Sequence, residues 1–256
     1  MPKIELLHED AFVFLSSLED SSVSLMVTDP PYGIGYKDWD CMDPVSFYKR
    51  TLESIHPKLK DDGSVWMFCA PSNVIEIILM IEKETPFVHH RDNWSIWARQ
   101  KGRGSTKRLK SVREDCIFLS KSKDYVWNEV KLLREVITPY MKDGRPRGWF
   151  IDQVSGLRVR WTGLSNVWNY TSAFWKSKLD PQIHPAQKPI LMLERLVRLS
   201  SNEGDLVVDP FCGSGSIARA CQVSNRNFMG CDSDGEMIEK ARKWINEHEG
   251  NLEAFL

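Results

Sequence analysis

The chain lacks the long apolar segments and the cysteine pattern that mark membrane proteins and disulfide-rich secreted proteins. None of its apolar runs approaches the roughly 18 residues of a membrane-spanning helix, and its start, Met1 to Glu5, is unlike a signal peptide. Its six cysteines contain no Cys-x-x-Cys pair, so we expect buried free thiols and no metal site. These absences predict a cytoplasmic protein with no membrane partner. The length suits a single domain over residues 1–256.

Two nucleotide-binding signatures are also missing around the glycines of the C-terminal half. Residues 209–216 (DPFCGSGS) follow a short apolar strand, and apolar residues at helical spacing come after them. No lysine follows the glycines, as a phosphate-binding P-loop requires, and Ala218 stands where a dinucleotide fold has its third glycine. The order strand, glycine turn, helix, second strand and acid at Asp232 still predicts a nucleoside site, because such an acid suits ribose hydroxyls.

A proline-rich turn is the most informative feature that is present. Residues 29–32 (DPPY) follow the apolar run 23–28, and two successive prolines force the chain to leave that strand in a stiff, extended turn. The turn presents a carboxylate, proline carbonyls and an aromatic ring at a strand's carboxyl end, where open α/β sheets bind ligands. The carboxylate and a carbonyl can accept both hydrogens of one amino group while the ring stacks on the base. The alternative is an ordinary loop in which Asp29 caps a turn and Tyr32 packs on the surface.

Together, these segments resemble the DNA amino-methyltransferases that use S-adenosylmethionine. DPPY matches the family's catalytic tetrapeptide, the glycine loop matches its cofactor loop, and their order matches the circularly permuted β-group. Residues 184–189 (HPAQKP) resemble the family's His-Pro-x-x-Lys-Pro segment, and Asp10 lies where the family places an acid near the adenine of the cofactor. Glu9 departs from the family, which often has glycine there, and Ser216 replaces a common threonine.

The resemblance implies two sets of site residues. The catalytic residues are Asp29, Pro30, Pro31 and Tyr32. The residues that bind S-adenosylmethionine are Asp10, Ala11, Asp29, Lys188, Asp209, Phe211, Gly213, Ser214, Gly215 and Asp232. Both glycines would let the backbone pass the methionine part, and Lys188 would lie near its carboxylate or order the loop. No cysteine follows a proline, as it typically does in enzymes that methylate a ring carbon of cytosine, so an exocyclic nitrogen is the better target.

Charge is distributed unevenly along the chain. From Arg99 to Lys178 there are 18 Lys and Arg and 7 Asp and Glu, a net charge of +11, which leaves −12 for the rest. This span is central, punctuated by glycine and rich in arginine and tryptophan, which favours nucleic-acid contact over a solvated face. We predict that residues 99–180 form an inserted target-recognition region. The predicted DNA-binding residues are Arg99, Lys101, Arg103, Lys107, Arg108, Lys110 and Arg113.

Hydrophobic periodicity predicts strands that alternate with helices, outside an irregular stretch over 128–180. We expect turns or flexible loops at 33–37, 61–63 and 102–105. The predicted strands are 3–7, 23–28, 64–69, 93–98, 115–120, 205–209 and 227–231. The predicted helices are 11–19, 44–58, 73–83, 189–200, 215–223 and 234–247. This pattern and the resemblance predict an α/β fold: a doubly wound, mostly parallel, Rossmann-like methyltransferase sheet, circularly permuted, with an inserted target-recognition region.

The features above predict a site-specific DNA methyltransferase that acts on N6 of a flipped adenine in double-stranded DNA. Adenine is favoured because the cytosine-N4 enzymes of the family more often have serine at the position of Asp29. The alternatives are cytosine-N4 methylation, methylation of RNA or of a protein amide, and a non-catalytic nucleic-acid-binding protein of the same fold. The resemblance also allows a homodimer and a cognate restriction endonuclease as partners.

Overall fold

The computed structural model divides the chain into two compact units, which are described separately. One unit is Asn128–Ser165, and the other joins Met1–Trp127 to Asn166–Leu256. Tyr36 and Lys37 of the predicted flexible loop lie outside the described residues. The structure describes residues 1–35, 40, 42–137, 141–143, 145–170, 183–184 and 187–247.

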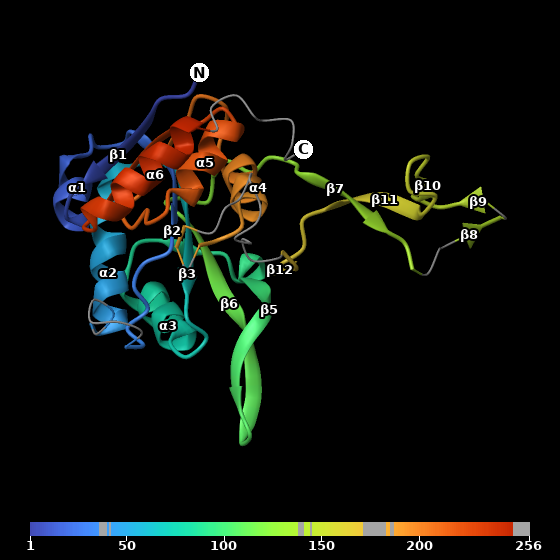
Figure 1. Ribbon diagram of the computed structural model, residues 1–256, viewed down its shortest axis with the longest axis horizontal. Helices are drawn as coiled ribbons and strands as arrows, with labels where there is room; N and C mark the ends of the chain where they lie inside the picture. The colour runs from blue at the N-terminus through green and yellow to red at the C-terminus, as the bar shows by residue number, and fades with distance from the viewer. Residues whose placement is uncertain are drawn as a thin grey trace. The chain divides into compact units, whose positions relative to one another are not determined.

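A mostly parallel sheet forms the centre of the larger unit (Figure 1). Its strands are β1 (Ile4–His8), β2 (Val23–Thr28), β3 (Leu59–Cys69), β4 (Val88–His89), β5 (Ser95–Ser105), β6 (Arg108–Ser120), β12 (Val167–Trp168), β13 (Leu206–Asp209) and β14 (Asn227–Asp232). The order is β1-β14-β13-β2-β3-β6-β5-β12, and β4 pairs with β6. The first five strands of this order are parallel, as are β5 and β12, whereas β6 is antiparallel to its neighbours.

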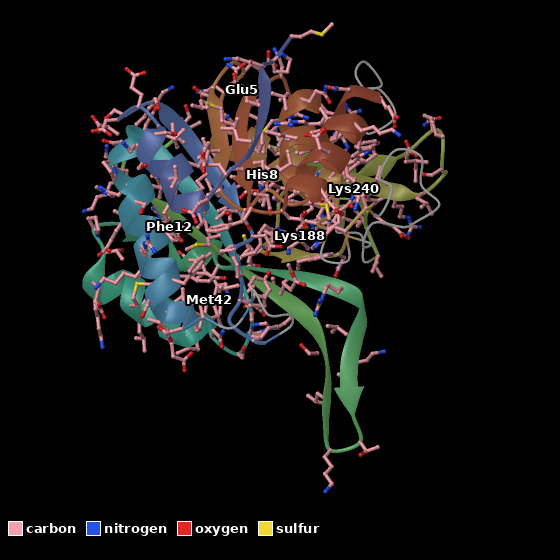
Figure 2. All side chains as sticks on the ribbon, turned by 60° about the vertical axis from the view of Figure 1, so that its left-hand side comes forward. Glu5, His8, Phe12, Met42, Lys188 and Lys240 are labelled. Carbon is pink, nitrogen blue, oxygen red and sulfur yellow. The ribbon has the colours of Figure 1, made fainter. Side chains whose placement is uncertain are left out.

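Helices cover both faces of this sheet. They are α1 (Ala11–Ser17), α2 (Pro44–Ile55), α3 (Val74–Glu84), α4 (Ile190–Ser200), α5 (Ser216–Val223) and α6 (Gly235–Glu247). Figure 2 shows α1, α2 and α3 on one side and α4, α5 and α6 on the other. Every residue of β2 is buried, as expected for a central parallel strand with helices on both faces. The predicted doubly wound α/β class is confirmed.

The central strand pairing brings together two segments that are remote in the sequence. β13 is parallel to β2, with Val207 opposite Leu25 and Val208 opposite Met26. The carboxyl ends of parallel neighbours lie at the same edge of a sheet. The turn at 29–32 and the loop at 209–216 are therefore neighbours.

The basic run forms a β-hairpin, which corrects the predicted loop at 102–105. β5 and β6 continue past the sheet as a two-stranded ribbon, with Arg103 opposite Ser111 and Ser105 opposite Arg108. The register shifts between Ala98 and Arg103 and again before Ser105. Because each strand satisfies the other's backbone groups, the polar sequence can remain extended without a buried face.

The predicted turn at residues 61–63 is also wrong, because these residues lie within β3. The pairing of β3 with β2 changes register between Val23 and Leu25. Such an irregularity accommodates additional residues in one strand. The two acids cause no burial cost, because Asp61 and Asp62 are exposed.

The smaller unit contains short strands where an irregular region was expected. β7 (Lys131–Glu135), β10 (Phe150–Ile151) and β11 (Arg158–Gly163) form a three-stranded antiparallel sheet, and β8 (Met141–Lys142) pairs with β9 (Arg145–Pro146). These strands escaped prediction because most of their side chains are exposed, with Val159 of β11 buried. In β7, Leu132 alone is partly buried.

Within the described residues, no helix combines the length and apolar character needed to cross a bilayer. Five cysteines fall in the described part of the chain, and all five are buried free thiols, as predicted.

Candidate active site

Four aspartates stand at the carboxyl ends of four adjacent strands. Asp10 follows β1, Asp232 ends β14, Asp209 ends β13 and Asp29 follows β2. The backbone N–H of Glu9 donates to the carbonyl of Asp232 at 3.2 Å, which ties the two outer ends together. The predicted cofactor segments and the predicted catalytic turn thus meet at one edge of the sheet.

Asp209 is a buried carboxyl group in the middle of this row. The hydroxyl of Thr28 donates to its Oδ1 at 2.7 Å, and the backbone N–H of Phe211 donates to the same oxygen at 3.0 Å. Burial raises the pKa of Asp209 to about 7, although both hydrogen bonds favour the ionised form. Asp209 therefore titrates near neutral pH and joins the end of β2 to the glycine loop.

The two glycines of this loop have different neighbours. Gly213 has a φ of +46°, its N–H donates to Asp232 Oδ2 at 2.9 Å, and a side chain here would meet only that oxygen within 4.0 Å. Gly215 has a φ of +76°, and a side chain here would lie 3.2 Å from Ala241 and Ile245 of α6. Gly213 therefore leaves open space beside the loop, whereas Gly215 is required for packing against α6. That both glycines let the backbone pass the methionine part of the cofactor stays a prediction.

The remaining predicted cofactor residues are placed around the same edge. Asp10 is exposed and caps α1, accepting two backbone N–H groups at 2.9 and 3.1 Å. Ala11, the next residue, is buried. The ring of Phe211 packs on Phe47 of α2, with centroids 5.4 Å apart. Ser214 is buried, with its Oγ 3.0 Å from another serine hydroxyl of the loop.

A buried charge cluster surrounds the catalytic turn. Tyr32 Oη donates to Asp29 Oδ1 at 2.6 Å and lies 3.3 Å from Glu114 Oε2. Lys188 Nζ donates to Asp29 Oδ2 and lies 3.0 Å from Glu114 Oε2. Figure 2 labels Lys188 between the two layers of helices. The structure thus brings Lys188, expected at the cofactor, onto the predicted catalytic aspartate.

Glu114 was not predicted as a site residue. Its Oε1 lies 2.7 Å from the guanidinium of Arg99, so two cations and two carboxylates form the cluster. One sequence signal existed: Glu114 and Asp115 directly precede the apolar run 116–119, and buried carboxylates are costly unless paired. Arg99 was predicted to bind DNA, and here it contacts this buried carboxylate.

Burial and pairing act against each other in this cluster. Burial raises the pKa of the Asp29 carboxyl even though Lys188 favours its ionised form. Burial would also raise the pKa of Glu114, but Lys188 and Arg99 outweigh it and hold that pKa below its usual range. Burial would lower the pKa of Lys188, but its two carboxylate partners raise it. Pairing therefore outweighs burial in the pKa of Lys188 and of Glu114, whereas burial outweighs pairing in the pKa of Asp29.

The backbone of the turn is held from both sides. Pro30 is buried and Pro31 is half-buried. The amide of Asn73 donates to the carbonyl of Tyr32 at 2.6 Å. The carboxylate of Asp40 accepts the next two backbone N–H groups of the loop at 2.7 and 3.2 Å. These contacts fix the direction in which the turn leaves β2.

The predicted DNA-binding residues all lie on the β5–β6 hairpin, in two environments. Arg99 and Arg113 are at its base, and Arg113 Nε lies 3.2 Å from Asp115 Oδ2. Lys107 and Lys110 are exposed near its tip. The backbone also places three other residues on the hairpin: Lys101, Arg103 and Arg108.

The sheet order and the adjoining turns define a Rossmann-like methyltransferase fold. Two solved structures share it: PvuII DNA methyltransferase (cytosine-N4-specific), with a TM-score of 0.70, 16% identity and 100% and 92% of the two chains covered, and the M1.HpyAVI–SAM complex, with a TM-score of 0.61, 23% identity and 94% and 98% covered. Because their sequence identity to this chain is low, these two structures are evidence for the fold alone.

Sequence comparisons identify the family. The family model for DNA methylases of the N6/N4 type matches residues 23–243. Type II methyltransferase M1.MboII of Moraxella bovis is 33% identical, covering 98% of this chain and 100% of its own length. DNA adenine methyltransferase YhdJ of Escherichia coli is 28% identical, covering 91% and 80%. The chain belongs to the S-adenosylmethionine-dependent DNA methyltransferases of the N6/N4 family.

The residues at the sheet edge fit S-adenosylmethionine. The open space beside Gly213 leaves room along the backbone, and the row of aspartates suits a ligand with a positive sulfonium, an amine and ribose hydroxyls. Asp232 would accept from the hydroxyls and Asp10 from the adenine amine. We assign Lys188 to the catalytic side of the site, because both of its carboxylate contacts lie there.

Proposed function

We propose that this methyltransferase modifies N6 of adenine at a specific sequence in double-stranded DNA. The observation that carries the proposal is the parallel pairing of β2 with β13, which places the 29–32 turn beside the cofactor loop. Aspartate at the first position of the turn favours adenine, because the cytosine-N4 enzymes of the family more often have serine there. An intact turn beside an intact loop also disfavours a protein that only binds nucleic acid.

The residues of the turn would act on the target amino group. This group is a poor nucleophile, because its lone pair is delocalised into the ring. Asp29 and the carbonyl of Pro30 would accept its two hydrogens, which localises the lone pair and orients the nitrogen. S-adenosylmethionine supplies a methyl group on a positive sulfur when it is bound.

The ring of Tyr32 would stack on the extruded base. Extrusion from the duplex costs a few kcal/mol of unstacking, and stacking on an aromatic side chain returns part of it. The carbonyl of Tyr32 is held by Asn73 at 2.6 Å, so the backbone that carries the ring is already positioned.

The hairpin and the smaller unit would each contribute contacts to DNA. The exposed lysines near the hairpin tip and the arginines of Asn128–Ser165, Arg145, Arg147, Arg158 and Arg160, would contact phosphates. Trp161 is exposed on β11 and offers a further aromatic surface. A homodimer and a cognate restriction endonuclease complete the proposed partners.

The direct test uses tritium-labelled S-adenosylmethionine and DNA from a strain that lacks methylation. Nucleoside analysis of the product should find the label in N6-methyladenine, and methylation-sensitive sequencing should locate it in one short motif. Label in cytosine alone would overturn adenine as the target. Failure to bind S-adenosylmethionine in calorimetry would favour the non-catalytic alternative, and label in RNA but not in DNA would overturn the DNA substrate.

A further inference from the structure

Both oxygens of the catalytic carboxylate accept a hydrogen bond in the structure. Tyr32 Oη donates to Asp29 Oδ1 at 2.6 Å, and Lys188 Nζ donates to Oδ2. An amino group that approaches Asp29 would therefore compete with these donors for the carboxylate oxygens. Lys188 is the better mimic of that amino group, because it also presents nitrogen-bound hydrogens to the carboxylate.

Both donors have a second acceptor within reach, and it is the same atom. Glu114 Oε2 lies 3.0 Å from Lys188 Nζ and 3.3 Å from Tyr32 Oη. Glu114 Oε1 contacts Arg99 at 2.7 Å, which fixes the carboxylate and leaves Oε2 directed at the catalytic turn. Lys188 therefore does not lose its buried charge partner if it leaves Asp29.

We propose that Lys188 occupies, in the resting enzyme, the place of the target amino group on Asp29, and that Glu114 retains Lys188 when the base enters. Lys188 and Glu114 are then positioning residues, since they act through Asp29. The inference rests on the proposed function, because it requires an amino group as the substrate of this site.

Removal of either partner should impair Asp29 in a different way. Without Lys188, the carboxylates of Asp29 and Glu114 face each other with less compensation, so Asp29 takes up a proton more readily and accepts hydrogen bonds poorly. Without Glu114, Asp29 is the one carboxylate left to Lys188 among the described residues, and the base must displace a buried lysine that has lost its alternative partner. When both are removed, Asp29 no longer faces a second carboxylate, and the base no longer has to displace a lysine, so both penalties become smaller.

The double-mutant cycle tests this reasoning. Lys188→Met, Glu114→Gln and the double variant are compared by single-turnover methyl transfer on a duplex that carries the mapped motif. We expect losses of about 100-fold for Lys188→Met and about tenfold for Glu114→Gln. The double variant should be about tenfold more active than Lys188→Met alone. A double variant at or below the product of the two single effects would overturn the proposal.

A second readout separates positioning from folding and from cofactor binding. A duplex with 2-aminopurine at the target position reports base extrusion by fluorescence, and Glu114→Gln should lower this signal several-fold while Glu114→Asp retains most of it. Binding of S-adenosylmethionine should match the wild type in all variants, whereas the Tm of each single variant should fall because a buried partner is left unpaired. Loss of S-adenosylmethionine binding in Lys188→Met would make Lys188 a cofactor residue and overturn the proposal.

The matched control is Lys60→Met. Lys60 Nζ lies 3.1 Å from Asp205 Oδ1 in an ion pair outside the site, and the substitution removes that pair. It should leave methyl transfer and base extrusion unchanged. Activity of the wild type on DNA tests the proposed function separately from the order of the variants. An inactive wild type overturns both, whereas an active wild type with all variants equal to it overturns the inference alone.

Discussion

Charged side chains are buried and paired at the edge of the sheet, whereas they are exposed near the tip of the β5–β6 hairpin. At the edge, the side chains of Lys188 and Glu114 are 6% and 10% exposed and lie 3.0 Å apart. On the hairpin, Lys107 and Lys110 are exposed to solvent. Arg99 belongs to both regions, because it sits at the base of the hairpin and contacts Glu114.

This difference separates two uses of charge in one protein. A buried pair is weakly screened, and removal of one partner leaves the other with a large desolvation cost. An exposed cation is screened by salt and contributes little alone. Changes at the edge should therefore be large and specific to the chemical step. Changes on the hairpin should be small, additive and dependent on salt.

The largest effect is expected for Asp29→Asn, at the centre of the buried cluster. The amide presents a donor where the amino group needs an acceptor, so kcat should fall by about 1,000-fold while S-adenosylmethionine still binds. Methyl transfer and calorimetry measure the two quantities. The control is Asp20→Asn on the surface. Activity within tenfold of the wild type would show that the turn is not catalytic and would break the comparison.

Asp209→Asn tests whether a buried carboxyl held by neutral hydrogen-bond donors behaves differently from the carboxyls paired with cations. The pKa of Asp209 is about 7 when folded and 3.8 in the reference state. Because the folded pKa is the higher one, its stabilising contribution is complete below pH 3.8 and is lost as the pH rises through 7. The variant lacks this loss. From pH 5 to pH 8 its free energy of unfolding should therefore gain roughly 3 kcal/mol relative to wild type.

Chemical denaturation of both proteins without cofactor, at several pH values, measures that gain. Asp205→Asn serves as the control, since the pKa of Asp205 lies below its usual value, although burial alone would raise it. This variant should lose stability relative to wild type as the pH rises towards 3.8, the opposite sign, and its difference from wild type should stay constant from pH 5 to pH 8. A constant difference between Asp209→Asn and the wild type would show that Asp209 is not perturbed.

Arg99→Met addresses the residue shared by the two regions. If Arg99 serves the buried cluster, kcat should fall about tenfold, because Oε1 of Glu114 loses a charged hydrogen-bond partner. The KM for DNA and its dependence on salt should change little. The control is Arg91→Met, which breaks an exposed pair with Glu82. A higher KM with an unchanged kcat would assign Arg99 to the DNA, as first predicted from the sequence.

The parts of the site that could be predicted are those encoded by contiguous residues. The 29–32 turn and the 209–216 loop each follow an apolar strand, and parallel strands place their carboxyl ends at one edge. Glu114 could not be found in this way. It reaches the same edge because β6 is antiparallel to β3, so that Asp115, the residue after Glu114, pairs with Cys69 at the end of β3. No local pattern sets that direction.

The hairpin and the smaller unit were harder to predict for a related reason. Periodicity reveals a strand through its buried face, and the residues near the hairpin tip and in β7 have almost none. Composition still identified the charge of this region, because net charge does not depend on fold. Its role in binding DNA remains a prediction.

The smallest effect is expected for Lys110→Ala, on the exposed hairpin. Loss of one phosphate contact should weaken DNA binding about two- to fivefold at moderate salt and reduce the slope of log K against log salt concentration by about 1. Fluorescence anisotropy over a range of salt concentrations measures both, and kcat at saturating DNA should not change. Lys240→Ala on α6, equally a loss of one exposed lysine, should leave the slope as it is. Equal slopes for the two variants would mean that the hairpin does not follow the DNA, and the contrast between the two regions would then reduce to burial alone.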